Sequence, residues 1–458
     1  MKSLLRTLAC GALLAGAFCA TAQNTNSGYF VDGYTYRYQL NPAFGGEHGF
    51  VSMPALGNLN VGVNGNLHLS SVLYNVNGRT ALFTNPNVGV AEAMSKFHDK
   101  NRIGANLREN ILSVGFKALG GYNTVTIGAR AEVNAVVPKA FFSLAKEGIS
   151  NKTYDIRDLH ASARGYAEIA LNHSRDIKQV PGLRAGAAVK FLVGVANLDA
   201  SFNKAHLTLG EDAWTALTNA DIYANVGGFQ YETKLNNSDM PYVSGANLDG
   251  DGSIGPNGFG MAFDLGATYQ WRDFTFSAAV LDLGFIGFNN TMYASTDGDR
   301  TLNTDAYIFN ADDDAPNSFS NEWDRLRDNL DELYQLTDHG NIGSRTSALH
   351  ATLNFGAEYT LPYYRKLTFG FLSSTRLAGR YTWSEARFSA NVAPVKCFSA
   401  DVNFGVGTYG AAFGWMLSVH PKGFNLFLGM DHTLGKVTKE FIPLNSNASF
   451  NFGINFPF

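Results

Sequence analysis

One stretch of the sequence has the spacing of a metal-binding loop. Asn247, Asp249 and Asp251, followed by Gly252, match the first half of an EF-hand loop, in which oxygen ligands recur at every second position. The twelfth position of such a loop supplies a bidentate glutamate, and here it is Gly258. A solvated turn rich in Gly and Asp is therefore the favoured interpretation. We expect no cofactor, with weak Ca²⁺ binding by Asn247, Asp249 and Asp251 as the alternative.

No other spacing is typical of a catalytic or zinc site. The ten histidines are scattered, and neither an H-x-x-x-H nor a C-x-x-C pair occurs after residue 22. The G-x-S-x-G nucleophile motif is also absent. His350 and His420 lie on the polar side of alternating segments, but a structural role explains them better than catalysis. We predict that the protein is not an enzyme and has no catalytic residues.

Charged residues recur on the polar side of segments that alternate in polarity. Isolated buried charges are costly, so we predict that these residues form salt-bridge networks, which cross a lumen or hold an internal segment. They could also line a polar conduit. The predicted lumen charge network consists of Arg130, Glu132, Arg164, Glu168, Arg184, Lys190, Asp264, Glu358 and Asp401.

Composition indicates which elements must position these residues. Of the 458 residues, 45% are hydrophobic, 13% are aromatic and only 16% are charged, against about 25% charged in average soluble proteins. Gly contributes 48 residues, and the mean hydropathy of -0.10 is too low for a polytopic helical membrane protein. This mixture favours a large β protein whose strands alternate in polarity. The formal net charge of -4 gives no basic footprint for nucleic acid.

Period-two alternation in segments of about ten residues predicts the fold class. Such segments have the length of tilted transmembrane strands, whereas strands of soluble sandwiches usually have about 5–6 residues. We predict an all-β transmembrane antiparallel barrel of about fourteen strands, with a doubtful extra hairpin at 201–235. The strands are expected near 58–69, 109–118, 122–136, 161–173, 183–197, 260–271, 274–286, 347–360, 366–377, 380–392, 397–407, 410–419, 423–434 and 448–458.

The last expected strand is the sharpest local signal. Aromatic and aliphatic residues alternate with polar residues up to the final position, which resembles the assembly signal of bacterial outer-membrane barrels. The residues of this predicted assembly signal are Phe450, Phe452, Ile454, Phe456 and Phe458.

Connection lengths predict which end of the barrel faces the cell interior. Short links at 272–273, 362–366, 394–396 and 421–423 share one end with Phe458, so we expect them to be periplasmic. The long links, 287–345 and 435–446, are expected to be extracellular. Within the first of these, residues 321–337 show helical periodicity and predict an amphipathic helix; a shorter helix is expected around 91–98.

The first 22 residues read as a secretory signal peptide. Lys2 and Arg6 precede an apolar run that is too short to span a membrane, and Ala20-Thr21-Ala22 is a small-x-small cleavage site. Cleavage leaves Cys397 as the only cysteine, so no internal disulfide is expected. Lipoprotein processing at Cys10 or Cys19 is the weaker alternative. We predict the outer membrane of a Gram-negative bacterium as the location.

The segment that follows the signal carries the clearest family resemblance. Asn41-Pro42-Ala43, placed between the signal and the first strand, resembles the motif of the FadL-type fatty-acid transporters. The chain is still more similar to an uncharacterised group of outer-membrane barrels allied to FadL and to the PorV protein of type IX secretion. Further matching stretches are 165–171, 187–194 and 263–269.

The resemblance implies a fourteen-stranded barrel with residues 23–57 as an N-terminal plug and 58–458 as the barrel. A flexible periplasmic tail is the alternative for the plug. It also implies passive transport of hydrophobic small molecules, which bind from outside and leave sideways through the wall; the FadL ligand contacts do not transfer position by position. The second hypothesis is a PorV-like accessory or scaffold of protein secretion or surface attachment that transports nothing. Expected partners are outer-membrane lipids, the barrel assembly machinery, and a hydrophobic ligand or secreted proteins.

Overall fold

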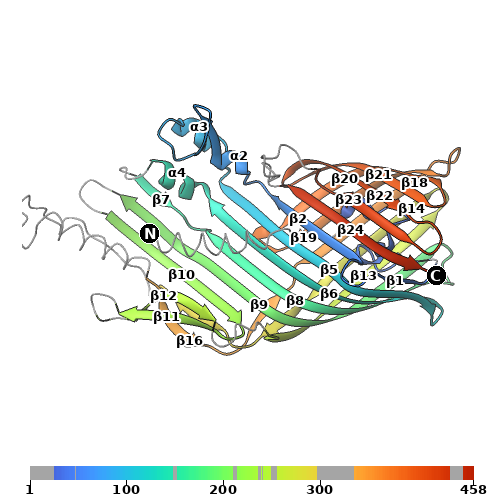
Figure 1. The fold of residues 1–458 in the computed structure, drawn as a ribbon, viewed down its shortest axis with the longest axis horizontal. Helices are drawn as coiled ribbons and strands as arrows, with labels where there is room; N and C mark the ends of the chain where they lie inside the picture. The colour runs from blue at the N-terminus through green and yellow to red at the C-terminus, as the bar shows by residue number, and fades with distance from the viewer. Residues whose placement is uncertain are drawn as a thin grey trace, which may run out of the picture.

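Fourteen antiparallel strands close into a barrel (Figure 1). The computed structural model describes residues 25–46, 48–147, 152–209, 214–235, 239, 241–248, 255–296, 335–433 and 447–458. In order around the wall, the strands are β2 (Asn58–Gly65), β5 (Lys100–Ala118), β6 (Gly121–Pro138), β8 (His160–Asp176), β9 (Leu183–Leu209), β13 (Gly258–Trp271), β14 (Phe274–Phe288), β18 (Ala351–Thr360), β19 (Leu367–Leu377), β20 (Trp383–Val395), β21 (Phe398–Gly407), β22 (Gly410–Val419), β23 (Asn425–Met430) and β24 (Ala448–Pro457).

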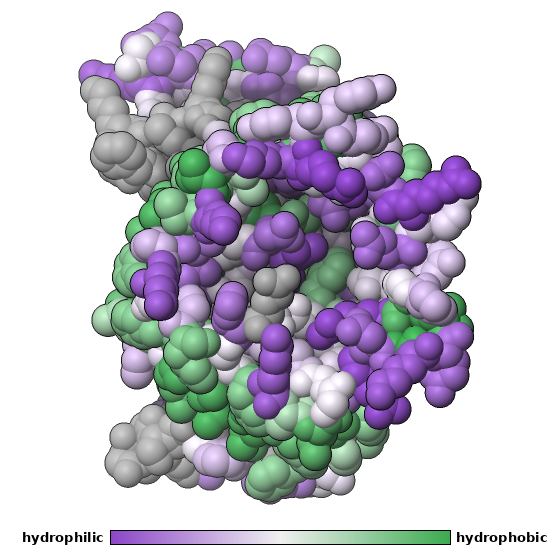
Figure 2. All heavy atoms as spheres, turned by 90° about the vertical axis from the view of Figure 1, so that its right-hand side faces the viewer, coloured by the Kyte–Doolittle hydropathy of each residue, from purple (hydrophilic) through white to green (hydrophobic). Residues whose placement is uncertain are grey.

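Alternation places apolar side chains outside and polar side chains inside. In β21, Val402 and Phe404 are 52% and 50% exposed on the outer face, whereas Asp401 and Asn403 are 1% and 3% exposed on the inner face. The outer face is therefore suited to lipid, and the chain has the fold of an outer-membrane β-barrel. Figure 2 views the molecule from the right-hand side of Figure 1, where hydrophilic residues gather across the face and hydrophobic residues lie toward its edges.

The barrel closes between the first and last strands. Val61 of β2 pairs with Phe450 of β24, and a short strand, β1 (Phe50–Ser52), pairs with both β24 and β5. Residues 53–57 separate β1 from β2, so the first strand of the wall is interrupted. Three backbone hydrogen bonds join this interruption to the neighbouring strands: Met53 N donates to Ile454 O at 3.0 Å, Ala55 N donates to Ile111 O at 2.9 Å, and Ile454 N donates to Leu56 O at 2.9 Å.

The two ends of the barrel differ. We call the end with Phe458 and the short links, among them 272–273 and 396–397, the turn end. At the opposite, loop end, β9 extends over 27 residues. The other elements at the loop end are α2 (Leu69–Val72), β3 (Leu73–Val76), β4 (Arg79–Leu82), α3 (Val90–Ser95), α4 (Lys139–Glu147), β7 (Lys152–Asp155), β10 (Trp214–Val226), β11 (Phe229–Leu235), β12 (Pro241–Leu248), β15 (Met292–Ser295), β16 (Thr337–Asn341), β17 (Arg345–Ala348) and η4 (Gly379–Tyr381).

The predicted fold class is confirmed, and each of the fourteen expected strands overlaps one strand of the wall. The two largest errors in the bounds are that β5 begins at Lys100 rather than 109 and that β9 continues past 197 to Leu209; other ends differ by a few residues, such as that of β23 at Met430 rather than 434. The doubtful hairpin at 201–235 corresponds to the end of β9 with β10 and β11. The helix expected around 91–98 is α3. The predicted signal peptide lies outside the described residues, as does the predicted helix at 321–337 up to residue 334.

Among the described residues, no helix is long and apolar enough to span a membrane.

Candidate functional site

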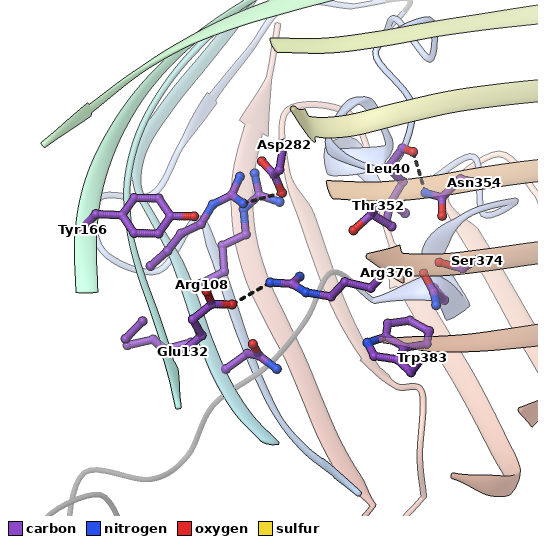
Figure 3. Close-up of a pocket in the computed structure, with 15 residues that line it drawn as sticks. Leu40, Arg108, Glu132, Tyr166, Asp282, Thr352, Asn354, Ser374, Arg376 and Trp383 are labelled. Carbon is purple, nitrogen blue, oxygen red and sulfur yellow. Dashed lines mark hydrogen bonds and ion pairs between the residues drawn. The ribbon is translucent and has the colours of Figure 1, made fainter. Parts of the chain in front are cut away.

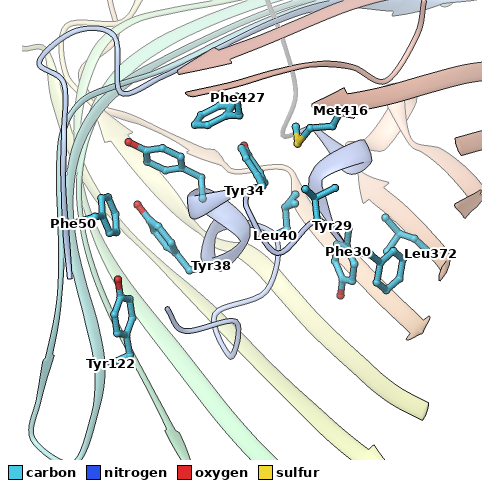
Figure 4. Close-up of a cluster of buried hydrophobic side chains, with 12 residues drawn as sticks. Tyr29, Phe30, Tyr34, Tyr38, Leu40, Phe50, Tyr122, Leu372, Met416 and Phe427 are labelled. Carbon is cyan, nitrogen blue, oxygen red and sulfur yellow. The ribbon is translucent and has the colours of Figure 1, made fainter. Parts of the chain in front are cut away.

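The N-terminal segment, residues 25–46, packs among side chains of the inner wall (Figure 4). Two short 3₁₀ helices, η1 (Asn26–Gly28) and η2 (Thr35–Gln39), give the segment its shape. Its aromatic residues form the largest buried cluster of the described chain with five residues from strands of the wall. This cluster contains Tyr29, Phe30, Val31, Tyr34, Tyr36, Tyr38 and Leu40 of the segment, and Phe50, Tyr122, Leu372, Met416 and Phe427 of the wall.

Asp431 fastens the start of the segment. Its carboxylate accepts hydrogen bonds from Asn26 N at 2.8 Å, Ser27 N at 2.6 Å and Ser27 Oγ at 2.7 Å. The carboxylate therefore caps the N-terminus of η1, where the first backbone N–H groups have no partner within the helix. Arg387 Nη1 donates to the backbone oxygen of Asp431 at 3.0 Å and supports this position.

The motif at Asn41, Pro42 and Ala43 fastens the other end of the segment. Asn41 Nδ2 donates to Ala267 O of β13 at 3.3 Å and to Ala278 O of β14 at 3.2 Å, while Asn41 Oδ1 accepts from Ala43 N at 2.9 Å. One amide side chain thus holds its own turn and binds the wall. The structure gives this three-residue motif a specific contact, with Asn41 and Ala43 both fully buried.

Inward-facing glycines make room for the segment. Gly266 of β13 and Gly186 of β9 are directly paired, and an added Cβ on either would lie less than 3.0 Å from Asn41 or Pro42. Gly370 of β19 would likewise meet Phe30. The wall is therefore shaped to receive this segment at close range.

Nearer the loop end, a first charge cluster spans β5, β6, β8, β9, β13 and β14. Its ion pairs are Arg108–Glu168 at 3.3 Å, Arg130–Glu168 at 2.9 Å, Arg130–Asp282 at 2.8 Å, Lys190–Asp282 at 2.6 Å and Lys190–Asp264 at 2.5 Å. All of these side chains are largely buried, so each charge is compensated by direct partners rather than by water.

Glu132 of β6 is the centre of a second charge cluster. It pairs with Arg164 of β8, whose Nε donates at 2.9 Å, and with His350 Nδ1 at 3.2 Å. Arg376 Nη2 of β19 donates to Glu132 Oε2 at 2.7 Å, and this contact crosses the lumen between opposite walls (Figure 3).

Six of the nine charged residues singled out in the sequence lie in these two clusters, and three lie elsewhere. Arg184 Nη2 donates to Ser174 Oγ at 3.1 Å near the turn end. Asp401 accepts from Asn403. Among the described ion pairs, none includes Glu358 or Asp401.

Sequence reasoning missed three members of the clusters. Arg108 precedes the expected start of its strand, and Arg376 was not singled out. Asp282 was hidden because the β13–β14 pairing shifts register between Phe263 and Leu265, and Asp282 has a positive φ of 57°. Leu281 and Asp282 are both buried at this bulge, which the strict alternation of a regular strand would forbid.

A polar chamber lies between the segment and the charge clusters (Figure 3). It contains about 610 Å³ of space free of atoms, part of it open to solvent. One wall carries Thr352, Asn354, Ser374, Arg376 and Trp383, and the facing wall carries Arg108, Glu132 and Tyr166. Arg130 of β6 also lines the chamber, and Asp282 lies on β14, the strand paired with the strand of Thr352. Leu40 of the segment lies at its edge, where Asn354 Nδ2 donates to Leu40 O at 2.9 Å.

A family model matches residues 42–431, most of this chain. The chain belongs to the DUF5723 family, a family of unknown function. No curated protein matches the sequence.

Three solved structures are similar to this DUF5723 barrel over nearly its whole length. A mutant of the monoaromatic hydrocarbon channel TodX shares 8% identity at a TM-score of 0.43, over 96% of this chain and 95% of that one. The P. putida toluene transporter TodX shares 9% identity at a TM-score of 0.39, over 96% and 94%. A Pseudomonas aeruginosa FadL homologue shares 9% identity at 0.37, over 96% and 98%. Such likeness concerns the fold alone.

The structure also describes part of the predicted calcium loop, His420 and the last strand of this DUF5723 barrel. Asn247 belongs to β12 and pairs with Gln230, whereas Asp249 and Asp251 lie outside the described residues. Within the described ranges, no three His, Cys, Asp or Glu side chains group as metal ligands. His420 Nδ1 lies 3.3 Å from Ser418 Oγ. Phe450, Phe452, Ile454 and Phe456 lie on the outer face of β24, and Phe458 follows it; their role in assembly stays a prediction.

Asp431→Asn is expected to loosen the N-terminal segment. In asparagine, an NH₂ group replaces one carboxylate oxygen and cannot accept a hydrogen bond from the backbone N–H in front of it, so that bond is lost. The bond to the remaining oxygen is weakened because the oxygen no longer carries the charge. Hydrogen bonds to charged groups contribute about 1.5–3 kcal/mol, and we expect the segment to open correspondingly more often. Tryptic cleavage after Arg37 in the detergent-solubilised barrel measures this opening. Glu92→Gln is the matched control, because Glu92 is exposed in α3 at the loop end, away from the segment; equal cleavage of both variants would contradict the prediction.

Proposed function

We propose that this barrel is a passive outer-membrane transporter of hydrophobic small molecules, gated by its N-terminal segment, with no catalytic role. The observation that carries the proposal is the chemistry of the wall beneath the segment. Phe50, Tyr122, Leu372, Met416 and Phe427 face inward there and are covered by the segment's own aromatic side chains. A water-filled pore would be lined by polar groups at these positions. An apolar lining instead suits a cargo that can replace the side chains of the segment.

The interruption of the first wall strand supplies the exit in this proposal. Residues 53–57 lie between β1 and β2, and Leu56 is 39% exposed on the outside. On the inside, an added Cβ on Gly57 would lie 2.8 Å from Tyr36 Oη, so the segment touches the interruption. Ala55 adopts a positive φ of 59°, which is uncommon for a residue with a side chain. Few backbone hydrogen bonds must break here for the wall to open sideways into lipid.

A reversible disulfide tests whether the segment is the gate. Ser418 Oγ donates to Gly33 O at 2.9 Å, and an added Cβ on Gly33 would lie close to the same Oγ. Gly33→Cys with Ser418→Cys, in a Cys397→Ser background, should therefore form a bridge between the segment and β22. In a Gram-negative host, we expect entry of the lipophilic dye N-phenyl-1-naphthylamine to stop when the bridge is oxidised and to return on reduction. The two single-cysteine variants control for the substitutions themselves. Equal dye entry with the bridge oxidised and reduced would show that the segment is not the gate.

The second candidate is a PorV-like scaffold that transports nothing. It is favoured by how completely the segment is fastened: Tyr29 binds β14, Tyr38 binds β6 and Asn41 binds β13. If the reduced, unbridged barrel admits no dye while exported proteins co-purify with it, the scaffold replaces the transporter as the working function.

A further inference from the structure

On the β19–β20 side of the polar chamber, two buried hydrogen-bond donors have no partner in the described part of the chain. They are the indole Nε1 of Trp383, which is 9% exposed, and Ser374 Oγ, whose residue is 2% exposed. Trp383 pairs directly with Arg376 across β19 and β20, and Ser374 lies two residues before Arg376 on the same inner face. An indole N–H can only donate, so the group it lacks is an acceptor.

The second charge cluster, which borders the chamber, has more cations than carboxylates among the described residues. Two guanidinium groups, those of Arg164 and Arg376, share the single carboxylate of Glu132. A neutral His350 leaves this balance unchanged. An uncompensated charge in a largely buried network is unfavourable, so the chamber favours an anion over a cation.

We propose that the chamber binds one small monovalent anion, either chloride or a small carboxylate. Arg376, Trp383 Nε1 and Ser374 Oγ hold it. Asn354 Oδ1 also lines the chamber without a described partner, but an amide oxygen only accepts hydrogen bonds and so does not hold the anion. The lining is polar on both walls, so this site is distinct from the apolar surface beneath the N-terminal segment. It does not depend on whether the barrel transports anything.

A smaller hollow connects the site toward the loop end. It shares Asn106, Arg376 and Trp383 with the chamber and continues to Tyr381 and Tyr409, which lie in connections of the loop end. In this proposal, the anion enters along the smaller hollow from the loop end.

Titration calorimetry of the whole barrel in detergent, in Tris base neutralised with sulfuric acid, tests the site with chloride and acetate as separate probes. We expect saturable binding of one anion per chain, weakened about tenfold by Trp383→Phe, which keeps the ring and removes the N–H. Trp271→Phe is the matched control, because Trp271 is 48% exposed on the outer face. The two probes show whether chloride or a carboxylate is the better occupant, and saturable binding of either supports the site.

Two results would overturn the proposal. One is heat release that rises linearly with both probes, which would mean that water alone fills the chamber. The other is an unchanged affinity in the Trp383→Phe, Ser374→Ala double variant, provided that heat-dependent mobility on gels shows the variant to be folded. Dye entry in the gating experiment is a separate readout, so failure of one proposal leaves the other testable.

Discussion

Gly266→Val is expected to expel the Asn41-Pro42 turn from the wall of the barrel. The new Cβ would lie less than 3.0 Å from Asn41 Oδ1 and Pro42 Cδ, and valine adds two further methyl groups. Valine itself favours strand conformation, and Gly266 has no left-handed backbone to lose, so the wall should tolerate the change. Overpacking of this kind usually costs about 1–3 kcal/mol. Opening of the segment should therefore increase about fivefold to about 150-fold.

Cleavage after Arg37 and conductance in planar bilayers both report this opening. Gly165→Val is the matched control, because a Cβ at Gly165 of β8 meets nothing within 4 Å. We expect faster cleavage and larger conductance for Gly266→Val and no change for Gly165→Val. If both variants conduct and are cleaved like the unmodified barrel, the close approach of Asn41 to the wall does not hold the segment.

Glu132→Gln is expected to destabilise the whole barrel. Glu132 is the counter-ion of Arg164 and Arg376 and also contacts His350, and its side chain is only 9% exposed. Removing its charge leaves two guanidinium groups without a counter-ion in a buried place. Breaking a buried ion pair in this way costs about 3–5 kcal/mol, which should lower the midpoint of guanidinium unfolding.

Two comparisons separate charge from other effects of this substitution. Glu147→Gln alters a pair with Lys152 at the loop end, where Lys152 is exposed, and should change the midpoint little. Adding Arg376→Met to Glu132→Gln removes one of the stranded cations and should recover part of the loss. A Glu132→Gln midpoint that matches the Glu147→Gln midpoint would show that the network does not stabilise the barrel.

The wall could be predicted from the sequence because alternation between lipid and lumen repeats in every strand. The two largest errors lie at the loop-end extensions of two strands. β9 continues to Leu209 by pairing with β7 and β10 beyond the barrel, and β5 starts early, at Lys100, where it pairs with Pro138. The β9 extension lies beyond the wall, so the pattern weakens there while the hydrogen-bond ladder continues. The early part of β5 still faces the lumen, where Arg108 belongs to the first charge cluster.

The site could be predicted only in part. Alternation along the strands shows which charged residues face inward, but it does not show which of them meet. It therefore could not separate the six correctly predicted members of the clusters from Arg184 and Asp401, which lie elsewhere. Those six are Arg130, Glu132, Arg164, Glu168, Lys190 and Asp264. Asp282 was not predicted because a β-bulge within β14 changes which residues of the strand face inward. Gly186 and Gly266 could have indicated the internal segment from the sequence. Both are glycines at inward-facing positions, where an empty lumen would have room for a side chain.

The contact between η1 and Asp431 constrains the order in which the molecule can fold. Asn26 and its carboxylate partner are 405 positions apart, and Asp431 follows β23 directly. The start of the segment therefore has no cap until nearly the whole chain is in place. Contacts between such distant positions form late, because the chain between them must be ordered first. Binding of the segment and closure of β2 against β24 should consequently occur as one final step. Until the wall is complete, the N-terminal segment would remain unbound.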